Sequence, residues 1–382
     1  MFSLQPHTIF LTLAGSQAHG TARAGSDVDL RGVCIAPVSV RLSLFSTFEQ
    51  YDGPLDDALA ARVLPRLRAH PTASRGLGVK TECVVFDLAK FVRLCAAANP
   101  NALEILFADE GDWLLETPAW RRLHAERHRF LTRKVEQTFV GYALAQLAKI
   151  ERHRAWLLEP PKKKPTRADF GLPESGTLAR DDQNRIEQSL ADKIRSYGID
   201  ELELAKPTRI ALRERLEAFH RDVTSASVDD LEDRMRAVAS HALALPPSVI
   251  TTLNTEKRYR AAMKHWEAYQ TWKRQRNPAR AELEQRFGYD TKHAMHLVRL
   301  MRMGLEALER GELIVRRHDA AELDAIRDGA LTFDELRATA ARLQDELKRA
   351  GARTALPHEL DHERVDRLAC DLMTGHATSA AC

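Results

Sequence analysis

Cysteine and long apolar runs are both scarce in this chain of 382 residues. The five cysteines are scattered, odd in number and without the spacing of a metal site, which argues against a disulfide framework and against a zinc finger. No stretch approaches the roughly 18 to 20 apolar residues that cross a bilayer, and no basic segment of a secretory signal precedes residues 9–13. We therefore expect a cytoplasmic globular protein with reduced thiols and no membrane association.

Positive charge is concentrated in two regions, although the net charge is only +3. Residues 254–304 contain 12 Lys and Arg against 5 Asp and Glu, and residues 121–154 contain 9 against 3. A solvated helix face usually carries both signs in balance. Such an excess of one sign suits a polyanionic partner, whose phosphates release counterions when they are neutralised.

The most informative stretch is residues 14–32. An apolar run, residues 9–13, precedes it and predicts a buried strand. Gly15 allows a sharp turn, and Ser16 is placed to cap a short helix that runs to about Gly20. Backbone amides at such a turn form an anion site that suits a polyphosphate.

Two aspartates follow the Gly-Ser turn after ten residues. On a strand, Asp27 and Asp29 project from the same face, as does Arg31 one period later. Arg31 is expected either to bind a nucleotide phosphate or to neutralise the two aspartates. Paired carboxylates repel each other unless a cation lies between them, and oxygen ligands favour Mg²⁺, with Mn²⁺ as an alternative. Arg23 and Ser26, in the connecting loop, are placed to reach a nucleotide sugar or phosphate.

This stretch resembles the signature of the DNA polymerase beta nucleotidyltransferase superfamily. In that superfamily, Gly-Ser and Asp-x-Asp hold the nucleotide and its metals. The resemblance implies an α+β fold, in which a polymerase beta-like core of a small mixed sheet with helices is followed by a mainly helical C-terminal region. It also implies metal binding by Asp27 and Asp29 and nucleotide binding by Gly15 and Ser16.

The resemblance implies a third carboxylate from a neighbouring strand, and residues 80–86 predict such a strand. Glu82 and Asp87 are the two candidates, and they face opposite sides of a regular strand. We favour Glu82, because Asp87 stands where the strand ends and suits the N-cap of the next helix. The patterns at residues 86–91 and 99–104 resemble the RNA-repair-associated branch of the superfamily, in which a carboxylate stands at the position of Glu82. Glu104 is expected to brace the Asn-Pro turn or to pair with an arginine.

A second signature opens a helix near residue 291, with Asp290 placed to cap it. Lys292, His296 and Arg299 fall on one stripe, opposite an apolar stripe. A stripe of cations without interleaved carboxylates suits a triphosphate or an RNA phosphate; a solvated helix face is the alternative. The stretch also resembles the same family, whose corresponding residues close over the nucleotide site.

We expect residues 1–112 to form the catalytic domain and residues 113–382 a helical domain with a basic nucleotide- or RNA-binding face. Four prolines and a lysine triplet predict a mobile, non-helical loop near residues 159–176, which either meets an anionic partner or is a solvated linker. Aromatic residues recur every third position from Trp266 to Trp272, a pattern more typical of a helix core than of a base-stacking platform.

The sequence thus predicts a Mg²⁺-dependent nucleotidyltransferase that moves a nucleoside monophosphate from a nucleoside triphosphate, ATP in our expectation, to a hydroxyl. Asp27, Asp29 and Glu82 would hold two metals, and Lys292 or a protonated His296 would donate to the leaving group. An RNA end, tRNA included, is the favoured acceptor. The alternatives are transfer of AMP to a protein or small molecule, a synthase that joins two nucleotides, and a non-catalytic RNA-binding subunit.

Overall fold

The computed structural model of this chain describes residues 2–73, 81–174, 247–276 and 278–379, with short pieces between residues 184 and 215. The chain divides into two compact units, residues 1–158 with 278–382, and residues 159–277. Within the described ranges, no helix has both the length and the apolar character that a membrane span requires. The boundary expected at residue 112 stays a prediction.

A five-stranded mixed sheet forms the centre of the first unit, in the order β3-β4-β2-β1-β5. β2 and β4 run parallel, and the other neighbours run antiparallel. The strands are β1 (Thr8–Leu13), β2 (Val28–Cys34), β3 (Gln50–Gly53), β4 (Thr81–Asp87) and β5 (Trp113–Glu116). The expected α+β fold with a small mixed sheet is confirmed, as is the buried strand at residues 9–13.

Alternation along β2 and β4 gives the sheet two different faces. Val28 and Leu30 of β2 and Cys83 of β4 are buried on one face, against the helix α3 (Asp57–Ala69). The residues between them, Asp29 of β2 among them, therefore point to the opposite face. α4 (Leu88–Ala96), α5 (Pro100–Leu106) and α6 (Pro118–Ala125) contribute to the core on that second side.

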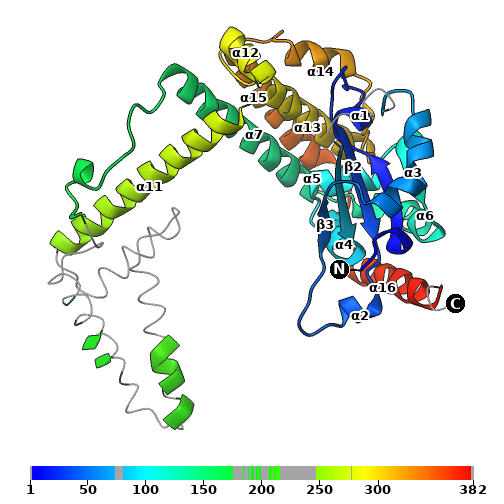
Figure 1. The fold of residues 1–382 in the computed structure, drawn as a ribbon, viewed down its shortest axis with the longest axis horizontal. Coiled ribbons are helices and arrows are strands. Elements are labelled where there is room, and N and C mark those ends of the chain that lie inside the picture. Colours follow the sequence, from blue (N-terminus) through cyan, green and yellow to red (C-terminus); the bar gives the residue numbers. More distant parts are fainter. Residues whose placement is uncertain are drawn as a thin grey trace. The chain divides into compact units, whose positions relative to one another are not determined.

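Helical packing completes the first unit. α13 (Thr291–Arg310) is buried along most of its length and packs against α7 (Lys134–Leu158) and α15 (Phe333–Arg353), as Figure 1 shows. The other elements of this unit are η1 (Gln5–His7), α1 (Gly15–His19), α2 (Val38–Arg41), η3 (Glu110–Asp112), η4 (Arg127–Phe130), α12 (Pro278–Phe287), α14 (Ala320–Arg327) and α16 (His362–Ser379).

Side-chain caps fix where several helices begin. Asp87 accepts a hydrogen bond from the amide of Ala89 and caps α4, and Asp290 accepts one from the amide of His293 and caps α13. Both caps were expected. The expected cap at Ser16 is wrong: the N-cap of α1 is Ala14, no side chain caps the helix, and Ser16 lies inside its first turn.

The second unit is described mainly by η5 (Ala168–Phe170) and α11 (Pro247–Gln275). Arg167 pairs with the buried Glu256 of α11 at 2.9 Å, and Asp169 accepts from Lys163 and Thr166. The described part of the proline- and lysine-rich segment, residues 159–174, contains a single 3₁₀ turn and no α-helix, as the prolines predict. Its mobility stays a prediction.

Candidate active site

Asp29 and Glu82 are neighbours across the parallel ladder of β2 and β4. Because residues on either side of each are buried on the α3 face, both side chains belong to the other face of the sheet. Asp87 stands at the far end of β4, where it caps α4 and accepts from the amide of Ala36. Of the two candidates for the third carboxylate, Glu82 is therefore the one beside Asp29.

Asp27 does not lie on β2, although the sequence pattern placed it on a strand with Asp29. It precedes the first residue of β2 and is exposed, so strand periodicity does not fix its direction. The ligand oxygens of Asp27, Asp29 and Glu82 do not all lie within 4.8 Å of one another; among the described residues, a different group meets that distance. Two of the three carboxylates are thus placed by the sheet, and the third stands on a loop beside them.

Gly15 brings α1 directly against Asp29. The amide of Ala14 donates to the backbone oxygen of Asp29 at 2.8 Å, and a β-carbon at Gly15 would overlap the Oδ2 atom of Asp29. Gly15 also has a φ of +57°, in the left-handed region that glycine adopts without strain. Glycine at position 15 is therefore required both for the backbone conformation and for the approach to the carboxylate.

The electrostatics of Asp29 suit a cation. Burial raises the pKa of the Asp29 carboxyl above its ordinary value, and the neighbouring Glu82 and Asp27 raise it further. Arg31, whose guanidinium lies 3.7 Å from Asp29, and Lys292 oppose that rise. A half-buried carboxylate surrounded by two others has the donor chemistry that Mg²⁺ prefers, so the residues present fit such an ion.

A cavity of about 510 Å³ opens over this face of the sheet. Gly15, Asp29 and Arg31 line one side, and His296 and Arg299 of α13 line another. The volume lies in the usual range for small-ligand sites. The structure thus brings residues from both ends of the chain to one cavity. Ser16, Asp27, Glu82 and Lys292 are not part of its lining.

Arg299 of the predicted cationic stripe of α13 is buried, whereas Lys292 and His296 are partly exposed. Arg299 is only 5% exposed; it donates to Oε1 of Glu104 at 2.5 Å and approaches the sulfur of Met303 at 3.1 Å. The other carboxylate oxygen of Glu104 lies 3.0 Å from Nε2 of the buried His19. Glu104 therefore pairs with an arginine, which is one of the two roles predicted for it. Its two contacts join α1, α5 and α13.

Burial and neighbouring charges determine the protonation states of Glu104, His19 and His296. Burial alone would raise the pKa of Glu104, but Arg299 and His19 hold it below its ordinary value, so the carboxylate is ionised. Burial lowers the pKa of His19, and Arg299 lowers it further. Burial, followed by Arg299, His19 and Lys292, also brings the pKa of His296 well below its ordinary value. A protonated His296 is therefore disfavoured at neutral pH, contrary to the role considered from the sequence.

Arg23 and Ser26 fasten their loop. The guanidinium of Arg23 donates to both oxygens of Asp328 and to Asp324 of α14. The hydroxyl of Ser26 accepts from the backbone amide of Arg23 at 2.9 Å. These contacts tie the loop before β2 to the C-terminal part of the unit, and nucleotide binding by either residue stays a prediction.

The cavity also has residues that the sequence reasoning missed. His19 ends α1, and its place within the Gly-Ser stretch was a signal that could have drawn attention to it. Asn101 of α5 and Tyr142 and Gln146 of α7 line the cavity too. The α7 residues follow Asp29 by more than 100 positions and carry no motif, so only the packing of α7 brings them there.

Comparisons with known proteins agree with this geometry. A search of curated proteins and a search of solved structures gave no match to the chain. A family model does match, over residues 3–158, which include the whole sheet, Gly15, Asp27, Asp29 and Glu82. The resemblance to the RNA-repair branch is thereby confirmed over that range: residues 3–158 match the model of RlaP, the RNA repair pathway DNA polymerase beta family.

Proposed function

We propose that this protein is a Mg²⁺-dependent nucleotidyltransferase that transfers a nucleoside monophosphate from a nucleoside triphosphate to a hydroxyl of RNA. The observation that carries the proposal is the pairing of Asp29 with Glu82 across the parallel strands, beside a cavity whose opposite wall carries Arg299 and His296. Carboxylates on one side and the guanidinium of Arg299 on the other suit a metal-bound triphosphate.

Asp27, Asp29 and Glu82 would hold the metal ions in this proposal. Bound there, Mg²⁺ lowers the pKa of the attacking hydroxyl and offsets the charge of the triphosphate. Gly15 keeps the start of α1 against Asp29 and leaves no side chain between them. Ser16 lies in the first turn of α1, where its hydroxyl would bond a phosphate oxygen.

The chemical step forms a bond from the acceptor oxygen to the α-phosphorus and breaks the bond to the β-phosphate, releasing pyrophosphate. Lys292 and Arg299 supply positive charge where the leaving group develops its own. His296, neutral because of burial and its cationic neighbours, is suited to accept a hydrogen bond from the substrate rather than to donate a charge. Arg23, Ser26 and Arg31 would shape the entrance near the sugar.

RNA is the acceptor that the charge distribution favours. On α11, Lys264, Lys273 and Arg274 are all exposed. The helix contains six Lys and Arg but only two Glu. A small-molecule acceptor would not need such a surface, whereas a phosphate backbone gains affinity from it. ATP as the donor and a tRNA end as the acceptor are the first pair to examine.

The test is a transfer assay with purified protein, Mg²⁺, each α-³²P nucleoside triphosphate in turn and a pool of tRNA and short RNA. We expect label on RNA, and its loss in Asp27→Asn/Asp29→Asn. A protein that carries Asp366→Asn, an exposed aspartate of α16, serves as the matched control and should retain activity.

Other outcomes separate the alternatives. Label on protein or in a small product would replace RNA by that acceptor. Label in a dinucleotide formed without any acceptor would indicate a synthase. RNA binding without any transfer, in folded protein with either metal, would leave a non-catalytic binding subunit and refute the enzyme.

A further inference from the structure

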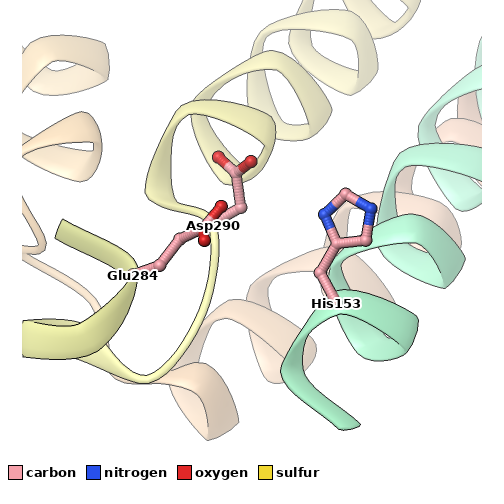
Figure 2. A group of neighbouring side chains, drawn as sticks. All are labelled: His153, Glu284 and Asp290. Carbon is pink, nitrogen blue, oxygen red and sulfur yellow. The ribbon is translucent and has the colours of Figure 1, made fainter. Parts of the chain in front are cut away.

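A second group of metal-ligand residues lies outside the cavity. His153 of α7, Glu284 of α12 and Asp290, the cap of α13, each offer one ligand atom, and these atoms all lie within 4.8 Å of one another. Figure 2 shows the imidazole on one side and the two carboxylates on the other, between α7 and the turn from α12 to α13. All three residues are less than a tenth exposed.

The donor set is suited to a transition metal. A neutral imidazole offers a lone pair to a metal ion. Ligands of one zinc ion stand about 2.0–2.2 Å from it, hence no more than about 4.4 Å from each other. The observed spacing therefore needs only a small contraction. A nitrogen ligand beside two carboxylates favours Zn²⁺ over Mg²⁺.

Surrounding contacts orient these ligands. The Nδ1 atom of His293 lies 2.6 Å from Oδ2 of Asp290, and the amide of the same residue donates to Oδ1 at 3.0 Å. Arg154 donates to the backbone oxygen of Gly288 at 2.8 Å and so fixes the turn against α7. Carboxylate ligands held by such outer hydrogen bonds are typical of metal sites.

Charge is the third argument. Glu284 and Asp290 are both 1% exposed and come from different elements. Bringing two ionised carboxylates together in a buried place is costly, and the cost is offset where positive charge is shared between them. A divalent ion with a neutral imidazole balances two carboxylates.

We propose that His153, Glu284 and Asp290 bind one divalent transition-metal ion of the Zn²⁺ type. This site is separate from the cavity over Asp29. The ion fastens α7 to the turn between α12 and α13. Since α13 begins at this turn, the ion also fixes the start of the helix that carries Lys292 and His296. This role is structural and does not depend on the proposed reaction.

Metal analysis of the purified full chain, prepared without chelator and with zinc in the medium, tests the proposal. We expect about one equivalent of zinc, a lower melting temperature after chelation, and its recovery with Zn²⁺ but not with Mg²⁺. Co²⁺ should give a visible absorption band from the site. Asp27→Asn/Asp29→Asn should keep the full equivalent, which separates this site from the cavity.

Variants locate the ion. Glu284→Gln and His153→Ala should each lower the bound zinc at least tenfold and remove the Co²⁺ band. Glu282→Gln, two positions away and exposed on the same helix, and His318→Ala, an exposed histidine, are the matched controls and should bind zinc normally. If a variant of the cluster fails to fold, the zinc content and the Co²⁺ spectrum of the wild-type protein still test the proposal.

Two results would overturn the proposal. One is folded wild-type protein that neither carries zinc nor gains thermal stability from added Zn²⁺. The other is bound zinc that the cluster variants and the control variants hold equally, which would indicate adventitious surface binding.

Discussion

Asp29 is a residue at which folding and chemistry oppose each other. Burial and the neighbouring Glu82 and Asp27 disfavour its charged form, yet only the charged form binds a metal ion. An acid whose pKa is higher in the folded state than in the unfolded state destabilises the folded protein once the pH exceeds the unfolded pKa. The metal-free protein should therefore lose stability as the pH rises through the interval between the unfolded and the folded pKa of Asp29.

If the proposed function holds, the substitution Asp29→Asn should abolish transfer, by about 10³-fold or more, because it would remove a proposed ligand of the metal. Without Mg²⁺ at neutral pH, the same variant should melt higher than the wild type by a few degrees, since ~1 kcal/mol moves the melting temperature of such a domain by about 2–4 °C. Scanning calorimetry with and without Mg²⁺ checks this. Equal or lower stability of the variant would contradict the electrostatic account.

At the scale of secondary-structure elements, the contact between α5 and α13 depends on one ionised carboxylate, that of Glu104. Glu104 meets Arg299 of α13 and His19 of α1, and side chains on both sides of the Glu104–Arg299 pair are largely buried. Breaking a buried pair from one side leaves an uncompensated charge, which costs far more than loss of an exposed pair. This contact therefore holds the cavity wall together.

Glu104→Gln should lower the free energy of unfolding by about 3–5 kcal/mol, measured by urea denaturation at neutral pH. The double variant Glu104→Gln/Arg299→Gln should lose less than the sum of the two single variants, because it leaves no orphaned charge. The exposed pair Arg342–Glu346 on α15 is the control, and Glu346→Gln should cost at most about 0.5 kcal/mol. Strict additivity in the cycle would mean that the pair carries no coupling.

At the scale of the whole molecule, the cavity over Asp29 and the exposed cations of α11 lie on different parts of the chain. The cavity belongs to the unit of residues 1–158 and 278–382, while α11, with its excess of exposed Lys and Arg, belongs to the other unit. A transferase acting on a long polyanion can use a second unit to hold the acceptor. Nucleotide binding should then be separable from RNA binding.

Reversal of three α11 charges, Lys264→Glu/Lys273→Glu/Arg274→Glu, should weaken RNA binding at least tenfold. It should also reduce the salt dependence of that binding, by a slope of ~0.9 for each lost phosphate contact. Nucleotide affinity should stay unchanged. Filter binding over a salt series and nucleotide titration measure the two effects.

The control for that experiment is a triple reversal in the first unit, Arg310→Glu/Arg349→Glu/Arg353→Glu, at three exposed positions. It changes the net charge by the same amount. Equal weakening of RNA binding by both triples would show a general charge effect and remove the assignment of RNA to α11.

Local patterns in the sequence predicted local structure well. The strand at residues 9–13, the break at Asn99 and the caps at Asp87 and Asp290 all appear in the structure. Each depends on hydrophobic periodicity or on a side chain that bonds a backbone amide a few residues away. Ser16 was misjudged because the turn at Ala14 already begins the helix.

The sequence by itself determined the family resemblance, the mixed α+β character and the choice of Gly15 and Asp29, because these depend on residues close together in the chain. Only the tertiary structure decided that Glu82 adjoins Asp29, that Arg299 is buried against Glu104, and that His296 is neutral. Strand pairing and burial join residues about 50 to 200 positions apart, and the protonation of a side chain follows from neighbours that no local pattern names.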